Sequence, residues 1–215
     1  METHVIIPVR MLKNVKSRLS SVLTEDWRRK LNLRMLLDVL NSVREVEELK
    51  RTVVVSPDLE VLRFSRRLGF EVLHEEAEKG VNEAVFYAIK NCVKNGASAV
   101  LILPSDVPLV SPEDLVKVLR LGERNPSVVV SPSARLDGTN ALLLNPPNVI
   151  STFYEQNSFF SHVAEALRKK VKVGVYVSRR LMLDVDNFED LTEFLRVGWK
   201  TCSHRFLREV LKFGS

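Results

Sequence analysis

The chain has 215 residues, of which 45% are hydrophobic and 27% charged, and it carries a formal net charge of +5. This composition is typical of a globular protein, and a chain of this length buries about 70% of its unfolded surface without a disulfide or structural metal. The basic residues mostly alternate with acidic ones and lack interleaved aromatics, which argues against nucleic acid as a partner. No apolar run approaches the ~20 residues of a membrane span, so no membrane partner is expected.

Cysteine and glycine usage narrows the class of site further. Cys92 and Cys202 lie too far apart for a zinc ribbon or a redox pair, and they favour a reducing, cytoplasmic compartment. The N-terminus enters a β-like segment directly instead of a signal peptide. The eight glycines are too widely spaced for either G-x-G-x-x-G or G-x-x-x-x-G-K-S/T. Any phosphate site must therefore use cationic side chains, single turns and metal.

Strands and helices are predicted to alternate along the chain, from the periodicity of apolar residues and from capping signals. In chain order we expect strand 5–9, helix 24–46, strand 51–56, helix 58–68, strand 70–73, helix 81–94, strand 99–103, a helix from 111, strands 128–130 and 141–144, helix 158–170, strand 171–177, and helices 187–197 and 203–212. This order favours one α/β domain over residues 1–215, with a mixed, mainly parallel sheet flanked by helices. Ligands of such sheets bind beyond the carboxyl ends of the strands.

The loop after the first predicted strand is strongly basic. Arg10, Lys13, Lys16 and Arg18 place four cations within nine residues. Guanidinium and ammonium groups both suit phosphate oxygens, so these residues are candidates for holding a polyphosphate at the end of the strand. The alternative is a solvated basic loop without a ligand.

Acidic residues follow two other predicted segments. Asp106 lies between two prolines at the exit of the most apolar strand, where a stiff loop would fix its carboxylate. Asp184 and Asp186 alternate along an extended segment and therefore lie on one side of it. The three carboxylates can together bind one Mg²⁺, which takes one or two carboxylates plus substrate phosphates. The alternatives are a turn role for Asp106 and a helix N-cap role for Asp186 or Asn187.

Two further segments are rich in hydrogen-bonding groups. The D-G-T-N sequence at 137–140 and Ser158, at the start of a predicted helix, can each hold an anion, but a turn and a helix cap are the alternatives. His162 follows on that helix, where a capping or surface role is expected. The four histidines are dispersed and no G-x-S-x-G elbow exists, which argues against a zinc enzyme and a serine hydrolase.

Taken together, these segments resemble the CofC/FbiD nucleotidyltransferases, which make the guanylylated precursor of the deazaflavin coenzyme F-420. The matching pieces occur in family order along almost the whole chain: I-P-V-R at 7–10, K-S-R-L at 16–19, G-V-N-E-A at 80–84, P-S-D-V-P at 104–108, D-G-T-N-A-L at 137–142, Ser158-Phe159 with His162, and L-D-V-D at 183–186 followed by Glu189-Asp190-Leu191. The D-G-T-N-A-L and K-S-R-L pieces are the most specific. One departure is Glu155-Gln156-Asn157, where the family usually has a glycine-rich turn.

The resemblance implies a single-domain nucleotidyltransferase fold of the GT-A, Rossmann-like class and a guanylyl transfer. GMP would move from GTP to the phosphate of 2-phospho-L-lactate or phosphoenolpyruvate, and pyrophosphate would leave. By the same resemblance, metal is expected at Asp106, and the small phosphorylated three-carbon acid at Thr139 and Ser158, with Asn140 beside them.

This chemistry agrees with the residue types present. A phosphate monoester is a dianion near neutral pH, so its oxygen can attack the α-phosphorus of GTP without a general base, and the protein must align two anions and neutralise charge. We expect Mg²⁺ as the cofactor, held by Asp106, Asp186 and Asp184. Lys16 and Arg18 are expected to act with Asp106 in catalysis, because they can stabilise the pyrophosphate leaving group. The nucleotide is expected to contact Pro8, Arg10, Lys13, Asn82 and Glu83, the last two at the guanine base.

Two other functions remain open from the sequence. One is a related transferase of the molybdenum-cofactor type, although such enzymes keep a glycine-rich first loop. The other is a non-catalytic nucleotide-binding regulator, against which the retained carboxylates and cations speak. A homodimer is a further hypothesis, with the apolar face at 206–211 as the contact.

Overall fold

The computed structural model describes residues 1–13, 15–76, 79–198 and 200–212. In this part of the chain the strands form one seven-stranded sheet of order β3-β2-β1-β4-β6-β5-β7. Their bounds are β1 Thr3–Pro8, β2 Leu49–Ser56, β3 Glu71–His74, β4 Ala99–Ile102, β5 Ser127–Pro132, β6 Thr139–Asn145 and β7 Lys172–Val175. The strand predictions are confirmed, with shifts of a few residues at their ends.

The sheet is mixed and mainly parallel, as expected. β1 pairs in parallel with β2 and β4, β2 with β3, and β5 with β7. β6 is antiparallel to both of its neighbours, β4 and β5. The carboxyl ends of β1 and β4 therefore lie side by side at one edge of the sheet, and the loops that follow them meet there.

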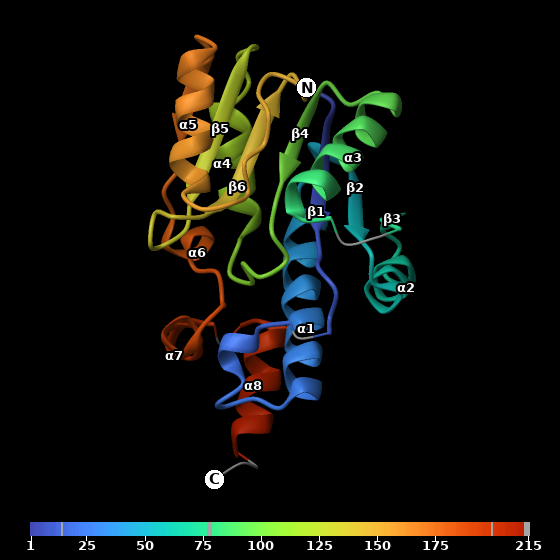
Figure 1. Cartoon of the computed structure of the whole chain (residues 1–215), viewed down its shortest axis with the longest axis vertical. Coiled ribbons are helices and arrows are strands. Elements are labelled where there is room, and N and C mark those ends of the chain that lie inside the picture. The colour runs from blue at the N-terminus through green and yellow to red at the C-terminus, as the bar shows by residue number, and fades with distance from the viewer. Residues whose placement is uncertain (14, 77–78, 199, 213–215) are drawn as a thin grey trace.

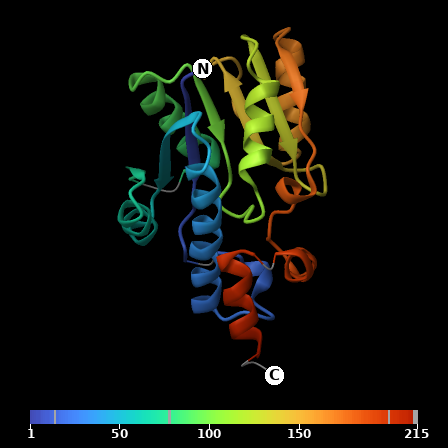
Figure 2. The same cartoon turned by 180° about the vertical axis from the view of Figure 1, so that it is seen from behind.

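Helices cover both faces of the sheet (Figures 1 and 2). Their bounds are α1 Glu25–Arg44, α2 Leu59–Arg67, α3 Val81–Lys94, α4 Pro112–Leu121, α5 Ser158–Arg168, α6 Arg179–Met182, α7 Phe188–Val197 and α8 Cys202–Lys212, with a 3-10 turn η1 at Ser17–Leu19. The longer helices begin and end close to the predicted positions. η1 and α6 were not predicted, because three or four residues are too few to show helical periodicity.

Alternation along the central strands produces two apolar layers. Ile7 of β1 packs with α1, α2 and α4 on one face, whereas Ile6 packs with α3 and α5 on the other. The run Ala99–Ile102 is fully buried, as its continuous apolar sequence predicts. The central strands are therefore held from both sides, which gives the loops at their carboxyl ends a rigid base.

A third apolar cluster lies beyond the edge of the sheet, where the lower half of α1 extends past the strands (Figure 1). Leu207 of α8 is fully buried there against residues of α1 and α7, and Phe206, Val210 and Leu211 pack against the same cluster. The apolar face of α8 is thus covered by its own chain. The structure therefore gives no support to the hypothesis that this face joins two copies.

No helix among the residues that the structure describes is long and apolar enough to cross a membrane.

Candidate active site

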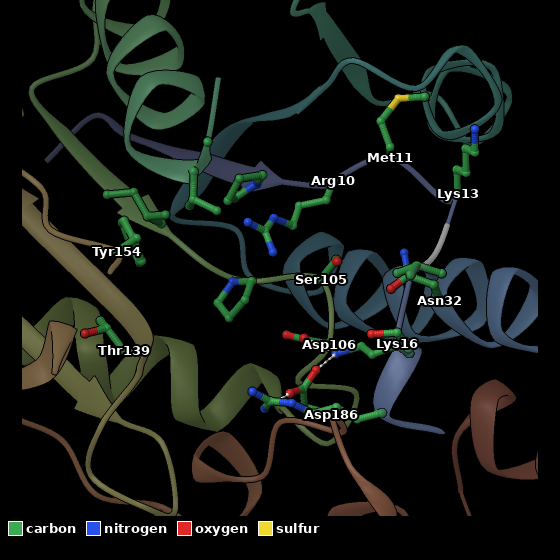
Figure 3. Close-up of a pocket in the computed structure, with 18 of the residues that line it drawn as sticks. Arg10, Met11, Lys13, Lys16, Asn32, Ser105, Asp106, Thr139, Tyr154 and Asp186 are labelled. Carbon is green, nitrogen blue, oxygen red and sulfur yellow. Dashed lines mark hydrogen bonds and ion pairs between the residues drawn. The ribbon is translucent and has the colours of Figure 1, made fainter. Parts of the chain in front are cut away.

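A cavity of about 980 Å³ lies at the carboxyl ends of β1 and β4. Its lining comes from the ends of β1 and β4 and the loops that follow them, the start of β6, the residues around the start of α3, and the single residues Asn32, Tyr154 and Asp186. Of the predicted site residues, those that line it are Pro8, Arg10, Lys13, Lys16, Arg18, Asp106, Thr139 and Asp186. Figure 3 shows Lys16, Asp106 and Asp186 together on one side of the cavity and Thr139 with Tyr154 on the other.

Lys16 is the centre of the charged side. Its ammonium group forms an ion pair with Asp106 and lies 3.5 Å from Oδ1 of Asp186. Burial alone would lower the pKa of Lys16, but the charges of Asp106 and Asp186 outweigh burial and raise that pKa above its ordinary value. Lys16 also has a φ of 51°, a left-handed conformation that is costly for a residue with a Cβ and that concentrates at functional sites.

Arg18 extends the charged side toward solvent. Its Nη1 lies 2.7 Å from Oδ2 of Asp186, and its side chain is 69% exposed. The carboxylate of Asp186 therefore lies between a buried ammonium and an exposed guanidinium. Arg10 and Lys13 line the same cavity on exposed stretches of the loop. The four cations predicted at the end of the first strand thus line one cavity in the structure.

Asp184 lies near this group but does not line the cavity. Its Oδ1 accepts a hydrogen bond from Nδ2 of Asn140 at 3.1 Å, and its Oδ2 lies 3.7 Å from Arg135. Burial, followed by the nearby charge of Asp106, raises the pKa of Asp184 to about 6. Nδ2 of Asn140 also donates to the carbonyl oxygens of Leu181 and Met182 at 3.0 Å. The Asn140 side chain therefore holds the 181–184 segment against β6 and does not line the cavity.

The three carboxylates that the sequence suggested for one metal are not gathered as a metal cluster. Within the described ranges no group of three or more His, Cys, Asp or Glu residues is placed to hold a metal ion. The physical reason is that Asp184 is engaged by Asn140, while Lys16 occupies the space between Asp106 and Asp186. Asp106 and Asp186 both line the cavity, however, and two carboxylates suit Mg²⁺ when substrate phosphates supply the remaining oxygens.

The opposite side of the cavity is neutral and built on three buried side chains. Oγ1 of Thr139 lies 3.0 Å from Nδ1 of His162 and accepts a hydrogen bond of 3.0 Å from Oγ of Ser158. Only Thr139 of the three lines the cavity. Ser158 and His162 lie behind it on the first turns of α5 and are 3% and 0% exposed. His162 is therefore neither a cap nor a surface residue, in contrast to the expectation from the sequence.

The two residues proposed to read guanine lie at the start of α3. Oδ1 of Asn82 accepts a hydrogen bond of 2.8 Å from the backbone amide of Tyr154, and Glu83 is exposed. The cavity is lined instead by Lys79, Gly80 and Val81, just before them. Gly80 has a φ of 105°, which requires glycine at the entrance to this helix. Contact of Asn82 and Glu83 with the base stays a prediction.

Asn32 and Tyr154 are among the lining residues that sequence reasoning missed. Asn32 is 3% exposed on α1, and its signal was a polar residue on the apolar face of an amphipathic helix. Tyr154 lines the cavity beside Thr139, with a buried hydroxyl that has no hydrogen-bond partner in the described part of the chain. Nothing in the sequence marked Tyr154, because it stands in an irregular segment between β6 and α5.

Comparison with known proteins identifies the family. The family model of CofC-like guanylyl transferases matches residues 3–213, almost the whole chain. The chain belongs to the CofC-like guanylyl transferase family. Membership makes it a nucleotidyltransferase and favours the guanylyl transferase prediction over the molybdenum-cofactor and regulatory alternatives.

Two relatives of this CofC-like chain cover nearly its full length. A phosphoenolpyruvate guanylyltransferase of Rubrobacter xylanophilus is 38% identical over 92% of this chain and 96% of its own. A 2-phospho-L-lactate guanylyltransferase of Methanothermobacter thermautotrophicus is 36% identical over 98% of this chain and 92% of its own.

Solved structures confirm the fold of this CofC-like chain. A structure from Desulfovibrio desulfuricans G20 is 18% identical, with a TM-score of 0.79 over 97% of this chain and 94% of that one. A nucleotidyl transferase from Methanothermobacter is 14% identical, with a TM-score of 0.69 over 97% of this chain and 99% of that one. The fold is that of GT-A-like nucleotidyltransferases, as the sequence predicted.

Proposed function

We propose that this protein transfers GMP from GTP to the phosphate group of 2-phospho-L-lactate or phosphoenolpyruvate and releases pyrophosphate. The observation that carries the proposal is the cavity with two unlike sides, one charged around Lys16 and one neutral around Thr139. The reaction brings together two substrates of different size and charge, and a cavity with two unlike sides can bind both. The near-full-length relatives named for these two acceptors support the same reaction. The product is the guanylylated precursor in coenzyme F-420 biosynthesis.

The charged side suits the triphosphate. A phosphate oxygen of the acceptor attacks the α-phosphorus, a new P–O bond forms, and the bond from the α-phosphorus to the bridging oxygen of pyrophosphate breaks. Lys16 and Arg18 face the position of the leaving group and stabilise its growing charge, with Arg10 and Lys13 beside them. The acceptor phosphate is already ionised near neutral pH, so no general base is required.

The carboxylates of Asp106 and Asp186 would hold Mg²⁺ together with phosphate oxygens of GTP. Bound there, the ion would withdraw charge from the α-phosphate and reduce the repulsion between the two substrates. Lys16 contacts both carboxylates and keeps them facing the cavity. Asp184 is held by Asn140 and positions the chain that carries Asp186.

The test is pyrophosphate release by the full chain with GTP, Mg²⁺ and each phosphorylated acid in turn. We expect release with GTP and at least one of the two acids. The matched controls are ATP or CTP in place of GTP and lactate in place of phospholactate, which remove the guanine base and the nucleophilic phosphate respectively. Absence of release with both phosphorylated acids would overturn the proposed function.

A further inference from the structure

The hydroxyl of Thr139 is the polar group that the neutral side presents to the cavity, and two buried side chains contact it from behind. Its oxygen lies 3.0 Å from Nδ1 of His162 and 3.0 Å from Oγ of Ser158. A hydroxyl can donate one hydrogen bond and accept two. The direction of each of these contacts therefore decides what Thr139 can offer to a ligand.

The backbone decides the direction of the contact with His162. The amide of Phe153 lies 2.9 Å from Nε2 of His162, and a backbone amide can only donate. Nε2 must therefore be the unprotonated nitrogen, and a neutral ring then carries its proton on Nδ1. Burial lowers the pKa of His162 to about 4, so the ring is neutral near pH 7. It follows that Nδ1 donates to Thr139 and cannot accept from it.

In the contact with Ser158, the Thr139 oxygen is again the acceptor. Oγ of Ser158 donates to Oγ1 of Thr139, so the Thr139 oxygen receives two hydrogen bonds and its acceptor capacity is filled. Among the residues with described positions, no protein acceptor is bonded to the hydrogen of Thr139. Because Thr139 lines the cavity, that hydrogen remains available to a ligand.

We propose that His162 is a positioning residue, which together with Ser158 fixes the Thr139 hydroxyl as a donor aimed at an anionic oxygen of the phosphorylated acid. The identity of the ligand rests on the proposed function, whereas the direction of the hydrogen bonds rests on the geometry alone. A donor fixed before binding needs no reorientation when the anion arrives, and a hydrogen bond to a charged oxygen is stronger than one to a neutral group. Ser158 supports the same orientation, because its hydroxyl fills the second acceptor position of the Thr139 oxygen.

The first test reads the ring of His162 directly. Nitrogen NMR of the ¹⁵N-histidine-labelled full chain at neutral pH distinguishes a ring protonated on Nδ1 from one protonated on Nε2, with His162→Gln used to assign the signal. We expect the Nδ1–H form with and without added phosphoenolpyruvate. A ring protonated on Nε2 would overturn the proposal, whatever reaction the protein catalyses.

The second test separates positioning from structural support. In His162→Gln the side-chain amide can still accept from the amide of Phe153, near the position of Nε2, but it has no donor in the place of Nδ1. We expect His162→Gln and Thr139→Val each to raise the KM for the acceptor about tenfold, the effect of one lost hydrogen bond to a charged group. The KM for GTP should stay unchanged in both variants.

The double variant decides between the two roles. If His162 acts through Thr139, then His162→Gln combined with Thr139→Val will raise the acceptor KM no further than Thr139→Val alone. Multiplied effects, or an unchanged KM in a folded His162→Gln, would overturn the proposal. An inactive wild type would instead refute the proposed function, and the nitrogen spectrum would still decide whether His162 directs Thr139.

Discussion

At the scale of single residues, the decisive feature is one buried cation between two carboxylates. Lys16 keeps its charge because Asp106 and Asp186 outweigh the cost of burial. In turn, Asp106 is held in place by Lys16 and raises the pKa of Asp184 through its own charge. A substitution of Asp106 should therefore change both the rate of the reaction and the pKa of Asp184.

We expect Asp106→Asn to lower kcat by at least about 100-fold with the fold preserved, because the variant loses the charge that pairs with Lys16 and that, in the proposed reaction, would bind Mg²⁺. It should also move the pKa of Asp184 below its value of about 6, since one of the two causes of the increase is removed. Pyrophosphate release measures the first effect and carboxyl ¹³C NMR titration without metal the second. Asp26→Asn, which removes an exposed carboxylate paired with Lys30 on α1, is the matched control. Full turnover in Asp106→Asn would show that the Asp106 carboxylate is not needed for catalysis.

The sequence predicted most residues of the charged side, Asp184 excepted, whereas on the neutral side it predicted Thr139 but not the buried contacts of that residue. Basic and acidic loops that follow β1 and β4 meet because adjacent parallel strands place their carboxyl ends at one edge. The contact of Thr139 with His162 and Ser158 depends on how α5 packs against the sheet, and no local pattern encodes that packing. For the same reason Asn140 was expected at the acceptor, whereas its amide bonds the 181–184 segment.

At the scale of elements, the C-terminal helix depends on a side chain from the middle of α1. Asp38 is buried, and its carboxylate accepts hydrogen bonds from the backbone amides of Cys202 and Ser203 at 2.7 and 2.9 Å. Asp38 therefore satisfies the free amides at the start of α8 and places a negative charge at the positive end of the helix dipole. The amphipathic pattern predicted this helix but not its cap, because the capping residue is remote in sequence.

We expect Asp38→Ala to lower the stability of the protein by about 2 kcal/mol, or the Tm by about 6 °C, because buried amides lose a charged acceptor. Thermal unfolding followed by circular dichroism measures the shift. Asp26→Ala, on the exposed surface of the same helix, should leave the Tm nearly unchanged. Equal shifts in the two variants would mean that the Asp38 contacts contribute nothing to the docking of α8.

At the scale of the whole molecule, one buried carboxylate joins α4 to α6 and to the residue that follows β7. The side chain of Asp114 is 0% exposed and accepts hydrogen bonds from Nε of Arg180 at 2.9 Å and from the hydroxyl of Tyr176 at 2.8 Å. Ser111 donates to it as well, within the capping box of α4. Burial would raise the pKa of Asp114, but these hydrogen bonds outweigh it and hold the pKa well below its usual range.

This lowered pKa predicts how the free energy of unfolding depends on pH. Because the folded pKa of Asp114 lies below the unfolded value, near 3.8, the carboxylate stabilises the fold fully above that pH. The contribution is lost as the pH falls below about 4 toward the folded pKa, since the unfolded chain then binds the proton more readily. Asp114→Asn should therefore lower stability by about 2 kcal/mol at pH 7 and flatten the decline between about pH 4 and pH 2. Urea unfolding over this range, with the exposed neighbour variant Glu113→Gln as control, measures both effects, and an equally steep decline in Asp114→Asn would assign the acid sensitivity to other carboxylates.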